Sequence, residues 1–146
     1  MNEINGSDTA WVLVSTALVL LMTPGLALFY GGMVRAKNVM STFMHSFFAM
    51  GIVTVAWVTI GYSLAFGDTH GGVVGGFQHL FLAGVGLEAR PGTTIPHLLF
   101  CAYQMMFAII TPALISGAYA ERLKFSTYVA FTFFWSVLIY APLCHW

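Results

Sequence analysis

Four long stretches of the chain contain no Asp, Glu, Lys or Arg, and this spacing of charge constrains the fold more than any other feature of the sequence. The stretches cover residues 9–34, 38–67, 91–120 and 125–146. Each is longer than the roughly 20 residues that cross a hydrocarbon core about 30 Å thick. Only 7% of the residues are charged, against about 25% in ordinary soluble proteins. The sequence therefore predicts an all-α integral membrane protein with four transmembrane helices, near residues 9–32, 40–66, 95–118 and 126–144.

The basic residues indicate which side of the membrane each connection occupies. Four of them lie in the two short connections, namely Arg35, Lys37, Arg122 and Lys124, whereas the opposite side has Arg90 alone. Because positive residues are retained in the cytoplasm, we expect both short connections inside and both chain ends outside. We also expect Glu121, at the inner end of the third span, to pair with a basic residue of the neighbouring hairpin.

Composition and motif spacing argue against nucleic-acid binding and against catalysis. The formal net charge is zero, which disfavours a nucleic-acid partner, and no span interior holds an acidic residue. The histidines form neither an HExxH motif nor an i, i+4 pair; they are His45, His70, His79, His97 and His145. We therefore predict no enzyme activity, no catalytic residue, no metal site and no cofactor. The histidines are expected to be interfacial, with His97 and His145 kept as candidates for solute contact.

The third predicted span places polar groups among aromatic rings. Phe100, Tyr103, Gln104 and Phe107 are three, four and seven positions apart, so they share one helical face. Such a face can line a narrow path, and each aromatic ring attracts a partly dehydrated cation by about 0.5–2 kcal/mol. The alternative is that these aromatic side chains only pack or face lipid. Gln104 favours a position inside the bundle, because an amide in hydrocarbon needs a partner.

The long connection between the second and third spans, residues 67–94, is rich in glycine. It contains no GxxxxGK[ST] or GxGxxG pattern, so the glycines are expected to form turns rather than to bind phosphate. The apolar segment 77–83 within it is a candidate for a short helix at the membrane interface.

Small residues four positions apart recur in three of the spans. This spacing allows two helix backbones to approach closely in lipid. The pairs are Ala27 with Gly31, Gly61 with Ala65, and Ala113 with Gly117. We expect the spans to pack on one another.

Several motifs resemble those of the ammonium transporters of the Amt/Rh type. The matching segments are PGLALFYGGMVRAKNVMS (24–41), GYSLAFGD (61–68), GAYAERLKFS (117–126) and APLCHW (141–146). Members of that family have an eleven-span core and assemble as homotrimers with one pore per subunit. The resemblance implies that residues 1–146 are the first part of an eleven-span ammonium-transporter-like fold, contributing spans one to four of its membrane domain.

The resemblance also implies a function and a site. It implies transport of ammonium, ammonia or methylammonium through an aromatic-gated pore, by a multi-pass protein of the plasma membrane whose N-terminus lies outside. Along YQMMFAIITPAL, Phe107 corresponds to one ring of the family's gate and Tyr103, often Phe in the family, to an aromatic residue of the outer recruitment site; Gln104 lies beside it. The DFAGG segment, the two pore histidines and the second gate ring are absent from the sequence, so we expect this chain alone to lack a complete pore. Two alternatives stay open: an ammonium sensor, and a structural four-span membrane protein without transport.

Overall fold

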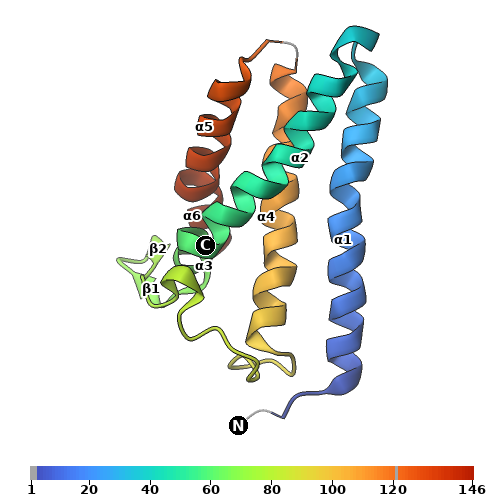
Figure 1. Ribbon diagram of the computed structural model, residues 1–146. Coiled ribbons are helices and arrows are strands. Elements are labelled where there is room, and N and C mark those ends of the chain that lie inside the picture. Colours follow the sequence, from blue (N-terminus) through green and yellow to red (C-terminus); the bar gives the residue numbers. More distant parts are fainter. Residues whose placement is uncertain (1–2, 121) are drawn as a thin grey trace.

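The computed structural model describes residues 3–120 and 122–146, which form a bundle of long helices joined at alternate ends (Figure 1). The first long helix is α1 (Gly6–Met33). The second begins with a 3₁₀ turn and continues through a π-helical turn, so that it comprises Ala36–Asn38, α2 (Val39–Ala56), Trp57–Gly61 and α3 (Tyr62–Phe66). The third is α4 (His97–Tyr119). The fourth also contains a π-helical turn and comprises α5 (Phe125–Trp135), Ser136–Tyr140 and α6 (Ala141–His145).

All four long helices are long and apolar enough to cross a membrane. The predicted all-α membrane fold with four transmembrane helices is therefore confirmed. Within the bundle, α1 packs against α2 and α4, and α5 packs against α2. Glu121, which was expected to form an ion pair, lies outside the described residues.

The first helix begins at a side-chain cap. The Asn5 side chain accepts hydrogen bonds from the backbone N–H groups of Ser7 and Asp8, which satisfies donors that have no partner inside the helix. Asp8 in the first turn places negative charge at the positive end of the helix dipole. The Asn5 N–H also donates to the carbonyl of Thr94 at 2.9 Å, so the start of α1 is attached to the segment that precedes α4.

The long connection lies at the end of the bundle that also holds the N-terminus, and we call this the loop end (Figure 1). It contains a small antiparallel hairpin of β1 (Thr69–His70) and β2 (Val74–Gly75). Of the short helix considered for residues 77–83, only a 3₁₀ turn at Leu80–Leu82 forms. Phe81 and Leu82 have φ values of 52° and 60°, and this left-handed backbone cannot continue a right-handed helix.

Small residues allow close approach between helices, as their spacing predicted. Gly31 is buried, and a Cβ atom added there would lie 2.5 Å from the Phe43 ring of α2. Gly117 of α4 faces Tyr30 of α1 in the same way, with 3.0 Å between its added Cβ and the Tyr30 ring. The Tyr30 hydroxyl then donates to the Leu114 carbonyl at 2.8 Å, so a hydrogen bond joins α1 and α4 where the glycine makes room.

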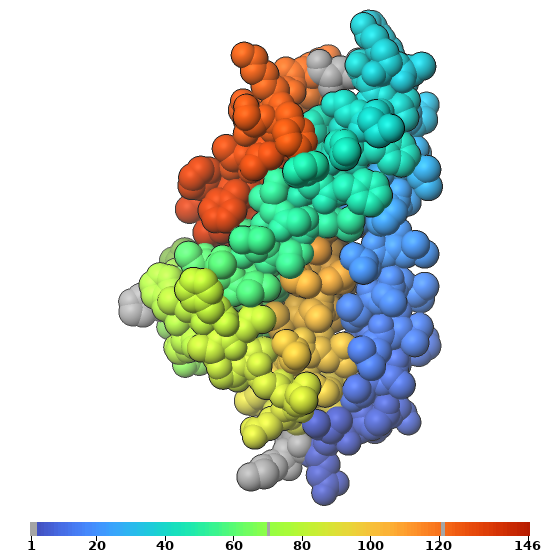
Figure 2. All heavy atoms as spheres, in the orientation of Figure 1, coloured from blue at the N-terminus to red at the C-terminus, as the bar shows by residue number. Residues whose placement is uncertain are grey.

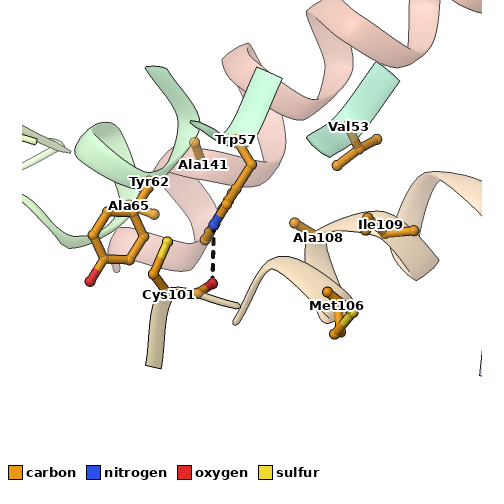
Figure 3. Packing of buried hydrophobic residues seen from close by; sticks show 9 residues of the cluster. All are labelled: Val53, Trp57, Tyr62, Ala65, Cys101, Met106, Ala108, Ile109 and Ala141. Atoms are coloured by element: carbon orange, nitrogen blue, oxygen red, sulfur yellow. Dashed lines mark hydrogen bonds between the residues drawn. The ribbon is translucent and has the colours of Figure 1, made fainter. Parts of the chain in front are cut away.

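The main apolar cluster joins the second long helix to α4 and α6 (Figure 3). Trp57 is 2% exposed, and its indole N–H donates to the Cys101 carbonyl at 3.3 Å. In contrast, α1 forms one edge of the molecule (Figure 2) and carries apolar side chains that nothing in the described chain covers, such as Trp11 at 74% and Leu21 at 66% exposed. An exposed apolar surface of this extent is suited to contact with lipid or with further protein.

Gly75 provides a test of how tightly the β hairpin packs on α3. A Cβ atom there would lie 2.5 Å from the Ser63 carbonyl oxygen and 2.7 Å from that of Leu64. Both are backbone atoms, which cannot rotate out of the way as a flexible side chain can. We expect Gly75→Ala to lower the free energy of unfolding by about 1–3 kcal/mol. The measurement is thermal unfolding in detergent, followed by circular dichroism. Gly51→Ala is the control, because nothing lies within 4 Å of its added Cβ and alanine favours a helix. An equal loss of unfolding free energy in both variants would contradict tight packing at Gly75.

Candidate functional site

The third long helix brings two of the predicted site residues into direct contact. Tyr103 and Phe107 are one turn apart on α4, and their rings meet edge to face with centroids 5.1 Å apart and planes 80° from parallel. Both side chains are half-buried. Edge-to-face pairs hold their rings in a defined orientation, so this pair offers an ordered aromatic surface to whatever lies against the helix.

Gln104 lies next to Tyr103 and is also half-buried. Its amide makes no hydrogen bond to any other described residue. An amide has both donor and acceptor capacity, and in an apolar environment those groups favour a polar partner. The three predicted residues thus combine an aromatic pair with an amide that is able to bind a further group.

Phe100 does not join this group, so the expected four-residue stripe is divided. Its ring meets Phe66 of α3 edge to face at 5.1 Å, and the Arg90 guanidinium lies 3.9 Å from the Phe100 ring centroid. Arg90 is also 5.3 Å from the Phe66 ring. The division arises because α3 and the long connection supply partners on the side of α4 where Phe100 lies.

A hollow of about 1230 Å³ opens at the loop end of the molecule. Its walls include Phe66, Asp68, His79, His97 and the segment 84–91. Tyr103, Gln104 and Phe107 do not line it. This hollow and the predicted site are therefore separate features of the described chain.

The structure gathers two histidines whose proximity the sequence did not indicate. The rings of His79 and His97 lie with centroids 5.3 Å apart, and His97 Nε2 is 2.6 Å from the hydroxyl of buried Tyr62. These residues come from the long connection, α4 and α3, so no local spacing brings them together. Within the part of the chain that the structure describes, no group of three or more His, Cys, Asp or Glu side chains converges on a metal position.

The other histidines with described side chains have structural contacts. His145 is engaged at both ring nitrogens, with the Thr69 hydroxyl at 3.2 Å and the Ala65 carbonyl at 3.1 Å. His45 was expected at the interface but is only 4% exposed, because its ring packs against Phe125 and Tyr128. Burial between helices does not set how deep His45 lies in the membrane, so its interfacial position stays a prediction.

Comparison with known proteins assigns a relationship along almost the whole chain. A family model described as "Ammonium Transporter Family" matches residues 10–146. An ammonium transporter of Mycobacterium tuberculosis (strain ATCC 25618 / H37Rv) is 51% identical over 162 residues, which cover 100% of this chain and 34% of that protein. The chain therefore spans about a third of the length of the curated relative.

Solved structures share the arrangement of the helices. The crystal structure of Candida albicans Mep2 matches with a TM-score of 0.89 and 32% identity, covering 99% of this chain and 32% of that one. A structure described as "Sensor Amt Protein" matches with a TM-score of 0.86 and 27% identity, covering 94% of this chain and 33% of that one.

The contact between Arg90 and its two rings generates a stability prediction. A guanidinium over an aromatic face contributes about 0.5–1 kcal/mol at a partly exposed site. We expect Arg90→Gln to lower the free energy of unfolding by about that amount, measured by thermal unfolding in detergent. Arg122→Gln is the matched control, because Arg122 is exposed at the opposite end of the bundle. Equal midpoints for Arg90→Gln and the unaltered chain would show that the ring contacts contribute nothing.

Proposed function

The chain belongs to the Ammonium Transporter Family, and on that basis we propose that it forms part of a path for ammonium or ammonia across the membrane, with Tyr103, Gln104 and Phe107 contacting the substrate. The observation that carries this assignment is the edge-to-face pair of Tyr103 and Phe107 beside the Gln104 amide, which has no hydrogen-bond partner among the described residues. Methylammonium, which has the same charged nitrogen, is the expected substitute substrate.

The proposed chemistry has two stages. At the first, the aromatic faces attract a partly dehydrated ammonium ion, and the Tyr103 hydroxyl or the Gln104 carbonyl accepts a hydrogen bond from it. At the second, nitrogen moves on through an apolar lumen past Phe107. Complete removal of hydration costs an ion far more free energy than one aromatic contact returns. We therefore propose that ammonium gives its proton to water at the outer mouth, and that neutral ammonia then enters the apolar segment.

The proposed assembly follows the family and the distribution of charge. We propose a homotrimer in the plasma membrane, with both ends of this chain outside. The short connections that hold the basic residues lie together at the end of the bundle opposite the loop end (Figure 1), which supports a cytoplasmic location for both. The relatives extend well beyond this chain, so the complete pore is proposed for the full-length protein.

A second candidate function is ammonium sensing. It is favoured by the similarity to the structure described as "Sensor Amt Protein". A sensor needs the same recognition of ammonium but only slow passage, so measured uptake distinguishes the two functions. A structural four-span protein without transport is the third alternative, and it requires neither recognition nor passage.

Uptake of methylammonium by cells that lack their own ammonium uptake tests the transport proposal. We expect the full-length protein to exceed empty cells, and Phe107→Ala to reduce the preference for methylammonium over sodium by about 2- to 30-fold, which corresponds to the loss of one contact of about 0.5–2 kcal/mol. Phe134→Ala is the matched control, because Phe134 is 59% exposed on α5.

Each other outcome of this experiment has a defined meaning. Uptake by the intact protein equal to that of empty cells would reject transport and favour the sensor. Normal uptake with unchanged selectivity in Phe107→Ala would reject the gate assignment. A selectivity loss of the same size in Phe134→Ala would place the effect outside the proposed site.

Cysteine labelling in intact cells tests the proposed orientation. We expect a membrane-impermeant maleimide to label Ser7→Cys directly, and Ala36→Cys only after permeabilisation, because both positions are exposed and lie near opposite ends of α1. The unaltered chain gives the background, with Cys101 buried and Cys144 half-buried. The reverse pattern would place the N-terminus in the cytoplasm.

A further inference from the structure

The histidine pair at the loop end has a geometry that the transport proposal does not use. His79 belongs to the long connection and His97 is the first residue of α4. Both side chains line the hollow of about 1230 Å³. Their ring planes are 90° apart with centroids separated by 5.3 Å. The pair is therefore accessible from the hollow and is formed by two elements that are distant in the sequence.

Each ring has one nitrogen fixed by a neighbouring oxygen. His79 Nδ1 lies 2.9 Å from the Ala83 carbonyl, which only accepts, so Nδ1 carries the proton and Nε2 keeps its lone pair. His97 Nε2 lies 2.6 Å from the Tyr62 hydroxyl, whose oxygen is able to accept from it. When it does, His97 Nδ1 keeps its lone pair. Histidines that bind metals have this arrangement, with the non-ligating N–H donated to a carbonyl or another oxygen.

The separation of the rings matches that of two imidazoles on one ion. With bonds of about 2.0–2.1 Å and a tetrahedral angle at the metal, two such rings have centres about 5 Å apart. We propose that His79 and His97 bind one divalent transition-metal ion, of the imidazole-preferring class Zn²⁺, Ni²⁺ and Cu²⁺. Water completes the coordination, since no third His, Cys, Asp or Glu converges within the described residues.

The charges around the hollow are compatible with a cation. The lining residues include the acidic Asp68 and Glu88 and the basic Arg90, and the Asp68 carboxylate accepts a hydrogen bond from the Gln78 amide at 2.9 Å. The Arg90 group is held over the Phe100 ring at 3.9 Å, so its position is set by the aromatic contacts described above. A divalent ion at the pair thus enters a hollow with two negative groups and one positive group.

Metal binding at this position has a structural consequence. Because His79 lies in the long connection and His97 begins α4, the ion joins the connection to the helix. A ligand that binds only the folded protein raises its stability. Zn²⁺ is therefore expected to raise the midpoint of thermal unfolding of the full chain.

Titration of the full chain, purified in detergent, with Zn²⁺ and with Cu²⁺ tests the proposal. We expect one ion per chain, and nitrogen couplings from two imidazoles in the electron paramagnetic resonance spectrum of the Cu²⁺ form. His79→Gln is expected to reduce affinity at least about tenfold, since even outer partners of a metal-binding histidine contribute about 10- to 100-fold. It should also remove one nitrogen coupling and abolish the thermal shift by Zn²⁺.

Two further variants keep this test decisive. His79→Cys retains a metal ligand and is expected to keep most of the Zn²⁺ affinity, which a merely structural role for His79 would not predict. His145→Gln is the matched control, because both ring nitrogens of His145 are already engaged. Unchanged affinity in His79→Gln, or an equal loss in His145→Gln, would overturn the proposal. Helical circular dichroism confirms that each variant is folded, and transport is not required for any readout.

Discussion

The structure depends on one constraint, which is that a backbone N–H or C=O group inside hydrocarbon must find its partner within the protein. A helix satisfies nearly all of these groups internally, and this is why long stretches without charge become long helices. The chain places its irregular backbone at the ends of the bundle, where the β hairpin, the 3₁₀ turn and the left-handed residues Phe81 and Leu82 lie. The remaining organisation of the molecule follows from how these helices then pack.

Packing between the helices relies on close approach and on aromatic side chains with polar tips. Among the described residues, three such side chains donate from one helix to a carbonyl of another: Tyr30 to Leu114, Trp57 to Cys101, and Tyr128 to His45. In lipid, apolar contact between helices has little advantage over contact with acyl chains, so small residues and interhelical hydrogen bonds determine the arrangement. Gly31 and Gly117 provide the space, and the aromatic donors fix the orientation.

The sequence predicted the parts of the fold that depend on local properties. The number of membrane helices follows from stretches without charge, because the thickness of hydrocarbon sets their length. Helical spacing also predicted that Tyr103 and Phe107 share a face. It did not separate Phe100 from them, since that separation depends on Phe66 and Arg90, which come from other segments. The contact between His79 and His97 also depends on segments that are distant in the sequence, so no local sequence pattern predicted it.

The two π-helical turns, Trp57–Gly61 and Ser136–Tyr140, have a consequence for how residues are assigned to helix faces. Each turn accommodates one residue more than an α-helical turn, and the two pack against each other, with the Trp57 and Tyr140 rings 6.1 Å apart. One added residue rotates everything beyond it by about 100°. A helical wheel drawn through either span as an uninterrupted α-helix therefore assigns Tyr62–Phe66 and Ala141–His145 to the wrong side.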